Sequence, residues 1–272
     1  MKPLVSILIP VYNRENLVAQ TIESALSQTY KNIEIIIVDN CSTDNTWEVL
    51  ETYSKSDERI KIFKNLTNLG PVRNWIRCIE ECSGEYSNFL YSDDTIHENF
   101  IDITLGILNK SKKIGFVRTK ITDRDKNLQV EKIISNKKEE KMSSSHYIYK
   151  KITGQGSLPN SPVCCLFRTK DLQKNLIIDV PNKYNLDFNF FGAGNDLLMH
   201  LLTAVDYPYV VYTERTFAGL KGHEGSFTTT NDLAKYYFIA KQFFCKKHNF
   251  IILYFLLYVY KLIFGLPKTK NL

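Results

Sequence analysis

The sequence has little of what marks several large classes of protein. Its 272 residues include only 12 glycines and 8 prolines, which excludes collagen-like and low-complexity chains. The six cysteines form no Cys-x-x-Cys pair and show no zinc-ligand spacing with histidine, so free thiols in a reducing compartment are expected. With 44% hydrophobic and 24% charged residues, the composition predicts a folded globular protein.

No long apolar segment opens the chain. The apolar run Val5–Val11 is short and is interrupted by Pro10, so it does not fit a signal peptide, and we expect a cytoplasmic protein. A second apolar run, Phe250–Tyr260, is shorter than the roughly 20 residues that a membrane-spanning helix needs.

The charge balance is moderately basic. A formal net charge of +6 favours anionic partners such as nucleotide phosphates, lipid headgroups or nucleic acid, without choosing among them. A nucleic-acid-binding module would gather its cations and aromatic side chains on one exposed face. Here the cations are spread along the chain and the aromatics concentrate near its C-terminal end, so we expect no nucleic-acid partner.

The first 91 residues alternate between β-branched apolar runs and segments of helical periodicity. The expected strands are residues 5–9, 33–38, 60–63 and 86–91. The strands are continuously apolar rather than alternating, which predicts an α/β fold with a mostly parallel sheet flanked by helices on both faces. Sheets of this kind bind ligands at the carboxyl ends of their strands.

Acidic residues follow two of these strands. Asp39 ends the second strand, and Asp93 and Asp94 follow the fourth. Adjacent carboxylates repel each other and supply the oxygen ligands that Mg²⁺ or Mn²⁺ prefers. The pattern therefore predicts a divalent cation at Asp93 and Asp94; the alternative is that these acids cap helices or lie in a solvated turn.

Beyond Asn99 the pattern is less regular. Residues 119–151 are rich in lysine, glutamate, aspartate, asparagine and serine, and we interpret them as a solvated surface excursion.

From Leu233 onward the chain becomes aromatic and apolar. The run Phe250–Tyr260 predicts a helix that is apolar all round, which must be buried in protein or in lipid. Basic residues flank this run, an arrangement that suits an anionic membrane surface: Lys246, Lys247, Lys268 and Lys270. A C-terminal helix packed on the domain is the alternative.

Two long segments resemble the family 2 glycosyltransferases. They are VSILIPVYNRENLVAQTIESALSQTYKNIEIIIVDNCSTDNT, residues 5–46, and NLGPVRNWIRCIEECSGEYSNFLYSDD, residues 68–94. The resemblance covers about residues 3–230 and implies a GT-A fold. It divides the chain into a GT-A domain at residues 1–230, with a nucleotide-sugar-binding half at 1–100 and an acceptor half at 101–230. A helical segment at 231–272 follows, with membrane contact expected through residues 233–267.

The resemblance also assigns roles to single residues. Asp196 is the catalytic general base, and Asp94, Asp93 and His223 bind the metal. The donor is bound by Pro10, Tyr12, Asp39, Asn68, Arg73, Asp93 and His223. Asp196 has the alternative role of capping a helix.

Three positions depart from the family pattern. Asn40 replaces a second aspartate after the second strand, Tyr91 replaces the leading aspartate of the acidic motif, and Lys221 replaces an arginine.

By this resemblance the protein is an inverting, Mn²⁺- or Mg²⁺-dependent hexosyltransferase. It moves a sugar from a nucleotide-sugar, expected to be a UDP-sugar, to a hydroxyl group of a glycan or lipid-linked saccharide. The expected process is cell-surface polysaccharide synthesis on the inner face of the cell membrane. The alternatives are a non-catalytic nucleotide-sugar-binding protein and a nucleotidyltransferase, although the segment after the first strand is not the glycine-rich phosphate loop of the latter.

Overall fold

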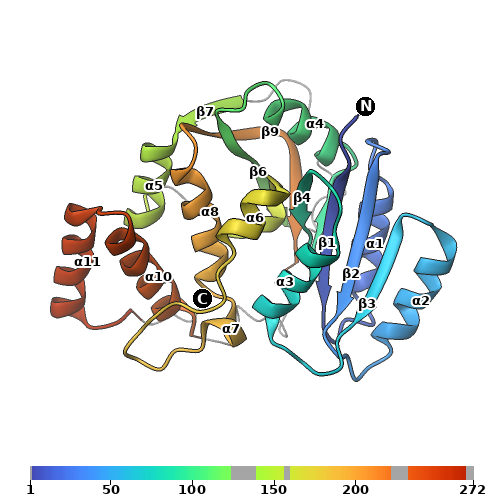
Figure 1. Ribbon diagram of the computed structural model, residues 1–272, viewed down its shortest axis with the longest axis horizontal. Coiled ribbons are helices and arrows are strands. Elements are labelled where there is room, and N and C mark those ends of the chain that lie inside the picture. Colours follow the sequence, from blue (N-terminus) through green and yellow to red (C-terminus); the bar gives the residue numbers. More distant parts are fainter. Residues whose placement is uncertain (1, 124–138, 156–159, 222–231, 268–272) are drawn as a thin grey trace.

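Strands and helices alternate in the first part of the chain (Figure 1). The computed structural model describes residues 2–123, 139–155, 160–221 and 232–267. The first elements are β1 (Val5–Val11), α1 (Val18–Leu26), β2 (Ile33–Asp39), α2 (Thr46–Ser56), β3 (Ile60–Lys64), α3 (Pro71–Glu81) and β4 (Tyr86–Phe89).

The later elements extend the sheet and add a helical layer. They are β5 (Thr95–Ile96), α4 (Phe100–Leu108), β6 (Ile114–Asp123), β7 (Glu139–Ser143), α5 (Ser144–Thr153), β8 (Cys165–Arg168), α6 (Thr169–Asn175), α7 (Phe188–Phe191), α8 (Asn195–Val205), β9 (Tyr209–Leu220), α10 (Ala234–Lys247) and α11 (Ile251–Phe264).

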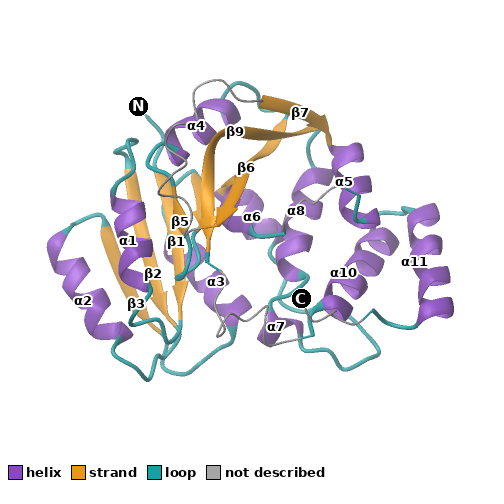
Figure 2. Ribbon diagram, turned by 180° about the vertical axis from the view of Figure 1, so that it is seen from behind, coloured by secondary structure: helices purple, strands orange, loops and turns teal. Residues whose placement is uncertain are grey.

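Within the described residues the strands form one sheet in the order β3-β2-β1-β4-β8-β6-β9-β5, with β7 paired to β9. Strands β1 to β4 are mutually parallel, and β8 is antiparallel to both β4 and β6. Helix α3 lies on one face of the sheet in Figure 1 and α1 lies on the opposite face in Figure 2. The predicted α/β fold with a mostly parallel, helix-flanked sheet is confirmed.

The core explains why the strands are continuously apolar. Ile35, Ile36 and Ile37 follow one another in β2 and all three are completely buried, which requires that both faces of the sheet are covered. All six cysteines are free thiols, as the spacing predicts.

The interpretation of residues 119–151 as a solvated excursion is wrong for the described part of that stretch. Strand β7 pairs with β9, and α5 buries Tyr147, Ile148 and Ile152. These apolar residues recur at helical spacing, but the many charged residues around them mask the pattern. Residues 124–138 lie outside the described part of the chain.

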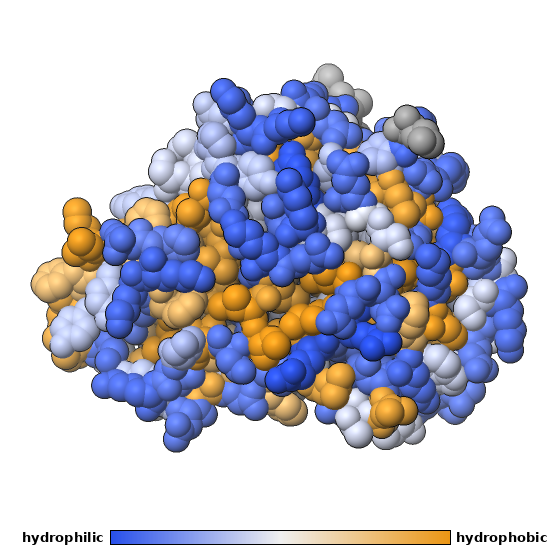
Figure 3. All heavy atoms as spheres, viewed as in Figure 1, coloured by the Kyte–Doolittle hydropathy of each residue, from blue (hydrophilic) through white to orange (hydrophobic). Residues whose placement is uncertain are grey.

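The C-terminal helices α10 and α11 lie at the end of the molecule remote from α2 (Figure 1). Helix α10 contributes to the main hydrophobic core through Phe238, Ile239 and Phe244, among others. Helix α11 packs on α10 and leaves much of its apolar surface exposed, so that apolar atoms gather at this end of the molecule in Figure 3. Among the described residues, no helix is both long and apolar enough to cross a bilayer.

Candidate functional site

The carboxyl ends of β1, β2 and β4 lie side by side because these parallel strands are neighbours in the sheet. Val11 of β1 is in register with Asp39 of β2, and the buried Pro10 is paired with Val38. Asp93 and Asp94 follow β4, the strand on the other side of β1. Strand order changes direction at β1, which is where ligands bind in open α/β sheets.

The Asp39 carboxylate is fully buried and already holds close protein partners. It accepts hydrogen bonds from the Ser42 backbone N–H, at 3.2 Å, and from the Ser42 hydroxyl. Lys64 Nζ lies 3.9 Å from its Oδ2. These contacts organise the turn after β2, and the predicted contact of Asp39 with the donor stays a prediction.

Asn40, which the sequence marks only as a departure from the family pattern, has a structural role at this edge of the sheet. Its Nδ2 donates to Asn68 Oδ1 at 2.8 Å and to the Gly70 carbonyl at 3.3 Å. Its Oδ1 accepts from Asn65 Nδ2 and from the Leu69 backbone N–H, each at 3.0 Å. A carboxylate can only accept hydrogen bonds, so this site needs the amide to hold the loop of residues 65–70.

Two other predicted donor contacts are exposed at the same edge. Tyr12 follows β1 and is 40% exposed, and Arg73 is exposed in the first turn of α3. Asn68 is exposed as well, but its oxygen accepts bonds from Asn40 and from the Gly70 N–H, so it also has a structural role.

The acidic pair after β4 is held by three neighbouring elements. Asp94 is buried; its Oδ1 accepts from the Lys221 N–H at 3.0 Å, and its carbonyl accepts from the Thr21 hydroxyl at 2.8 Å. Asp93 is half-buried, with Oδ2 3.8 Å from Arg14 Nε. The strand end therefore presents two adjacent and well-fixed carboxylates.

Asp196 lies in the first turn of α8 and is buried. Its Oδ1 accepts hydrogen bonds from the backbone N–H groups of Gly194, at 2.9 Å, and Leu197, at 2.7 Å. Its Oδ2 accepts from the Tyr237 hydroxyl of α10 at 2.8 Å. Tyr237 was not predicted as a site residue, because 41 residues separate it from Asp196 in the chain.

Burial raises the pKa of Asp196 to about 6, although the Tyr237 hydroxyl and the Leu197 N–H favour the ionised form and oppose the rise. Lys151 of α5 is buried too, and its Nζ donates to Asn160 Oδ1 at 2.6 Å. Burial lowers the pKa of Lys151 to about 7, with Arg118 adding to the effect. A carboxyl with a pKa near 6 is ionised at neutral pH and remains basic enough to accept a proton.

Tyr91 connects the base candidate to the acidic pair. It stacks on Trp75 with ring centroids 5.7 Å apart. Burial raises its pKa well above the usual range, and the negative charge of Asp196 is the next cause, followed by smaller effects that include Asp94 and Asp93. The charges of all three carboxylates therefore raise the pKa of this one phenol.

The described residues contain no cluster of three or more histidine, cysteine, aspartate or glutamate side chains arranged to hold a metal ion. His223, the predicted third ligand, lies outside the described residues. Of the three predicted metal ligands the structure describes Asp93 and Asp94, and the metal site stays a prediction.

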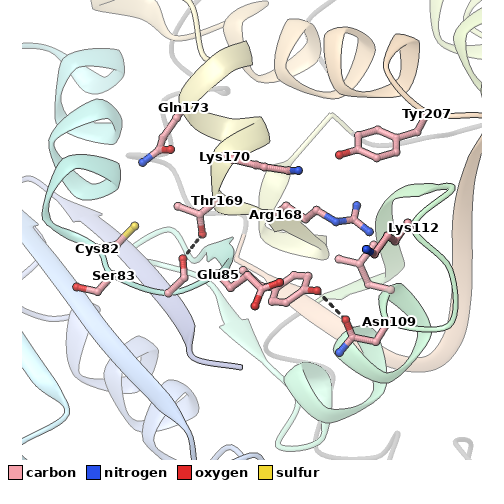
Figure 4. Close-up of a pocket in the computed structure, with 13 residues that line it drawn as sticks. Cys82, Ser83, Glu85, Asn109, Lys112, Arg168, Thr169, Lys170, Gln173 and Tyr207 are labelled. Atoms are coloured by element: carbon pink, nitrogen blue, oxygen red, sulfur yellow. Dashed lines mark hydrogen bonds between the residues drawn. The ribbon is translucent and has the colours of Figure 1, made fainter. Parts of the chain in front are cut away.

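A hollow of about 610 Å³ opens at the opposite, amino edge of the strands (Figure 4). The cations Lys112, Arg168 and Lys170 point toward it, with Glu85 on its lower side. Arg168 is held by the Ile114 carbonyl at 2.7 Å. The lining of the hollow includes neither the acidic pair nor Asp196, so this hollow is separate from the candidate site.

Sequence comparison identifies a family model that matches most of the chain. The model of "Glycosyl transferase family 2" matches residues 6–176. TuaG of Bacillus subtilis, a glycosyltransferase whose name assigns it to teichuronic acid biosynthesis, is 42% identical over 93 residues, which are 34% of this chain and 37% of that protein. The chain thus covers less than half the length of the curated relatives that it matches.

Structural comparison extends the likeness of the fold over most of the chain. Residues 1–349 of S. aureus TarS, solved in complex with UDP-GlcNAc, match with a TM-score of 0.67 and 17% identity, covering 89% of this chain and 66% of that one. The mannosyltransferase PcManGT of Pyrobaculum calidifontis, solved with GDP-Man and Mn²⁺, matches with a TM-score of 0.58 and 12% identity, covering 92% and 65%.

Proposed function

The chain belongs to glycosyl transferase family 2, and on that premise we propose that it transfers a sugar, with inversion, from a UDP-sugar to a hydroxyl group of a glycan or lipid-linked acceptor. The observation that carries this proposal is the buried Asp196 carboxylate, fixed by two backbone N–H groups and the Tyr237 hydroxyl, together with the acidic pair Asp93 and Asp94 that follows β4. In this proposal the proton acceptor and the donor-side carboxylates belong to one site.

Asp196 is the proposed general base. A sugar hydroxyl is a poor nucleophile, and its proton must be accepted by a positioned group as the oxygen attacks. With a pKa raised by burial to about 6, Asp196 is ionised at neutral pH. Attack from the face opposite the departing nucleoside diphosphate inverts the anomeric carbon.

The donor-side proposal rests on the strand ends. We assign Asp39, at the end of β2, to the uridine, and Pro10, Tyr12, Asn68 and Arg73 to the surrounding donor surface. The complex of TarS with UDP-GlcNAc supports a UDP-sugar as the first donor to test.

The acidic pair fits a divalent cation. Mg²⁺ is commonly held by one or two carboxylates together with the phosphates of its nucleotide, and Mn²⁺ accepts the same oxygen ligands. Asp94, fixed by the Lys221 N–H, and Asp93 would hold the ion, with His223 as the third proposed ligand. When bound, the ion stabilises negative charge on the departing diphosphate. The Mn²⁺ complex of the structurally similar PcManGT supports this assignment.

The first experiment distinguishes a general base from a helix cap at Asp196. Asp196→Asn should leave stabilisation by UDP and Mn²⁺ nearly unchanged and lower turnover of UDP-GlcNAc or another UDP-sugar by about 10²- to 10⁴-fold. Asp187→Asn is the matched control, because Asp187 caps α7 by accepting a hydrogen bond from the Phe190 N–H. This variant should leave turnover unchanged. If millimolar UDP with Mn²⁺ does not raise the melting temperature of the wild type, the donor assignment is wrong.

We further propose that α11 attaches the enzyme to the cytoplasmic face of the cell membrane, where a precursor of a surface polysaccharide is the acceptor. The supporting observation is the set of α11 side chains that are 42–77% exposed, which are Ile251, Ile252, Phe255, Leu256, Tyr258, Tyr260, Leu262, Ile263 and Phe264. Exposed apolar surface of this extent is typical of a protein or membrane contact. TuaG, a teichuronic acid biosynthesis enzyme by its name, supports the acceptor class.

Cations accompany this apolar face. Lys246 and Lys247 are exposed in the last turn of α10, and Lys261 lies in α11 itself. Each lysine near an anionic leaflet contributes about 1 kcal/mol to binding. Lys268 and Lys270, also predicted to flank the helix, lie outside the described residues.

Flotation with phosphatidylglycerol-containing vesicles at low salt tests the attachment. Ile252→Glu should reduce the bound fraction severalfold, because Ile252 is 77% exposed on α11. Leu66→Glu makes the same kind of change at a 98% exposed leucine outside α11 and should bind as the wild type does. Equal binding of both variants, or a wild type that does not float, would exclude α11 as the attachment.

A further inference from the structure

Helix α10 contacts the segment that carries Asp196. Gly194, the residue before α8, has a φ of +89°, a conformation that glycine adopts without strain. A Cβ at this position would lie 3.0 Å from the Ala240 Cβ and 3.1 Å from the Tyr236 carbonyl, both of α10. The start of α8 and the face of α10 are therefore in close contact, and one helix fixes the position of the other.

Tyr237 comes from this contact face of α10 and reaches the carboxylate. Its hydroxyl lies 2.8 Å from Asp196 Oδ2, while the backbone N–H groups of Gly194 and Leu197 both donate to Oδ1. A carboxylate offers about four lone-pair sites. Among the described residues, the hydrogen-bond donors to this carboxylate occupy three of these sites, and the fourth is on Oδ2, next to the tyrosine hydroxyl.

We propose that Tyr237 is a positioning residue for the base: its hydroxyl fixes the rotation of the Asp196 carboxylate so that Oδ2 presents its remaining lone pair to the acceptor hydroxyl. This inference rests on the proposed function of Asp196. In the step, the O–H bond of the acceptor breaks and its proton bonds to Oδ2, while the acceptor oxygen forms the new bond to the anomeric carbon and the diphosphate leaves with the bonding electron pair. Tyr237 keeps its own proton.

The position of Tyr237 gives this role to a part of the chain that the family model does not match. That model ends at residue 176, whereas α10 begins at Ala234. Tyr237 is partly buried and packs against the main core, so its hydroxyl is held in place rather than free to rotate into solvent. The C-terminal helices therefore complete the catalytic site as well as carrying the exposed face of α11.

Several ionisable groups face the Asp196 carboxylate. Tyr237 approaches from α10, Lys151 from α5 and Tyr91 from the segment after β4, and His200 Nδ1 contacts the Asp196 carbonyl from within α8. Burial holds the pKa of His200 well below its usual range, and Tyr237 and Tyr91 have raised pKa values, so these three stay neutral around pH 6 to 7. Lys151, with a pKa of about 7, is the group that titrates near Asp196.

The test is the Tyr237→Phe variant with Tyr236→Phe as its matched control. Both changes remove one hydroxyl from α10, but Tyr236 lies against Phe188 and Phe191. Carboxyl carbon NMR of ¹³C-labelled aspartate, with the Asp196 signal assigned from Asp196→Asn, measures the base directly without a substrate. Loss of the Tyr237 bond should raise the Asp196 midpoint by about one pH unit, because a hydrogen bond to the charged form favours it.

Kinetics supply the second measurement. In Tyr237→Phe the acid limb of kcat against pH for UDP-sugar turnover should move to higher pH by the same amount, and turnover at its plateau should stay several-fold lower because the carboxylate is no longer oriented. Tyr236→Phe should leave the limb in place. A purely structural tyrosine would lower the melting temperature without moving either midpoint.

The outcomes separate the two proposals. If the Asp196 midpoint and the acid limb do not move in Tyr237→Phe, the positioning role is refuted even where Asp196→Asn is inactive. If the NMR midpoint moves but Asp196→Asn retains full turnover, the geometry is right and Asp196 is not the base.

Discussion

Asp196→Asn should make the folded protein more stable while it removes activity. The folded-state pKa of Asp196 is about 6, raised by burial from the ordinary value of 3.8. A raised carboxyl pKa means that ionisation is less favourable in the folded state than in the unfolded state. The resulting cost to stability begins as pH rises above 3.8, when the unfolded chain ionises, and is complete above about 6.

The size of the effect follows from this pair of values. A rise from 3.8 to about 6, at about 1.4 kcal/mol per unit, corresponds to a cost of about 3 kcal/mol at neutral pH. Asparagine avoids that cost because it stays neutral. Its side-chain oxygen can still accept from Gly194 and Leu197, and its amide can donate to the Tyr237 oxygen, so the local hydrogen bonds have replacements.

Urea unfolding of wild type and Asp196→Asn between pH 4 and pH 7.5 is the assay. We expect the variant to be more stable by up to about 3 kcal/mol at the higher pH, with the difference shrinking toward zero near pH 4. A variant that is instead destabilised by about 1 kcal/mol at all pH values, as for a lost helix cap, would refute the reasoning and make Asp196 structural.

Three further variants test the surroundings of the site. In urea unfolding, Asn40→Asp should lower the free energy of unfolding by about 3 kcal/mol, because two donated hydrogen bonds are lost and a buried charge faces acceptors. Asn68→Asp changes the acceptor of the Asn40–Asn68 bond and should stay within about 0.5 kcal/mol of the wild type. Asp94→Asn should abolish the Mn²⁺-dependent part of thermal stabilisation by UDP; a full Mn²⁺ effect in this variant would place the ion elsewhere. Gly194→Ala should lower the melting temperature by several degrees, since its Cβ would contact Ala240 at 3.0 Å; an unchanged value would show that α10 moves freely.

The first four strands were predictable from the sequence because apolar runs mark them. A strand covered on both faces, such as β2 with its consecutive buried isoleucines, needs apolar residues at every position, and such runs are visible without a structure. Strand β7 has the opposite character: its sequence is EEKMS, its residues are exposed or half-exposed, and only pairing with β9 makes it a strand. Context overrides local propensity there.

The residues of the candidate site also differ in whether local sequence pattern or tertiary packing places them. Asp39, Asp93 and Asp94 could be placed because the topology of a parallel sheet brings strand ends together. Tyr237 could not, because its bond to Asp196 depends on how α10 packs against α8. The role of Asn40 depends on a chain of side-chain amides in which Asn65 donates to both Asn40 and Asn74; the only sequence signal is the number of asparagines at residues 40, 65, 68 and 74.

The tyrosine at position 91 is consistent with the chemistry proposed for Asp196. The family pattern that the sequence resembles has an aspartate at this position of the acidic motif, where its charge would add to those of Asp196, Asp94 and Asp93, which already act on Tyr91. A further negative charge there would oppose ionisation of Asp196, whose pKa burial has already raised to about 6. A base that is protonated at working pH cannot accept the acceptor proton. The neutral phenol of Tyr91 fills the position without adding charge, so the departure from the family pattern favours the ionised form of Asp196 more than an aspartate would.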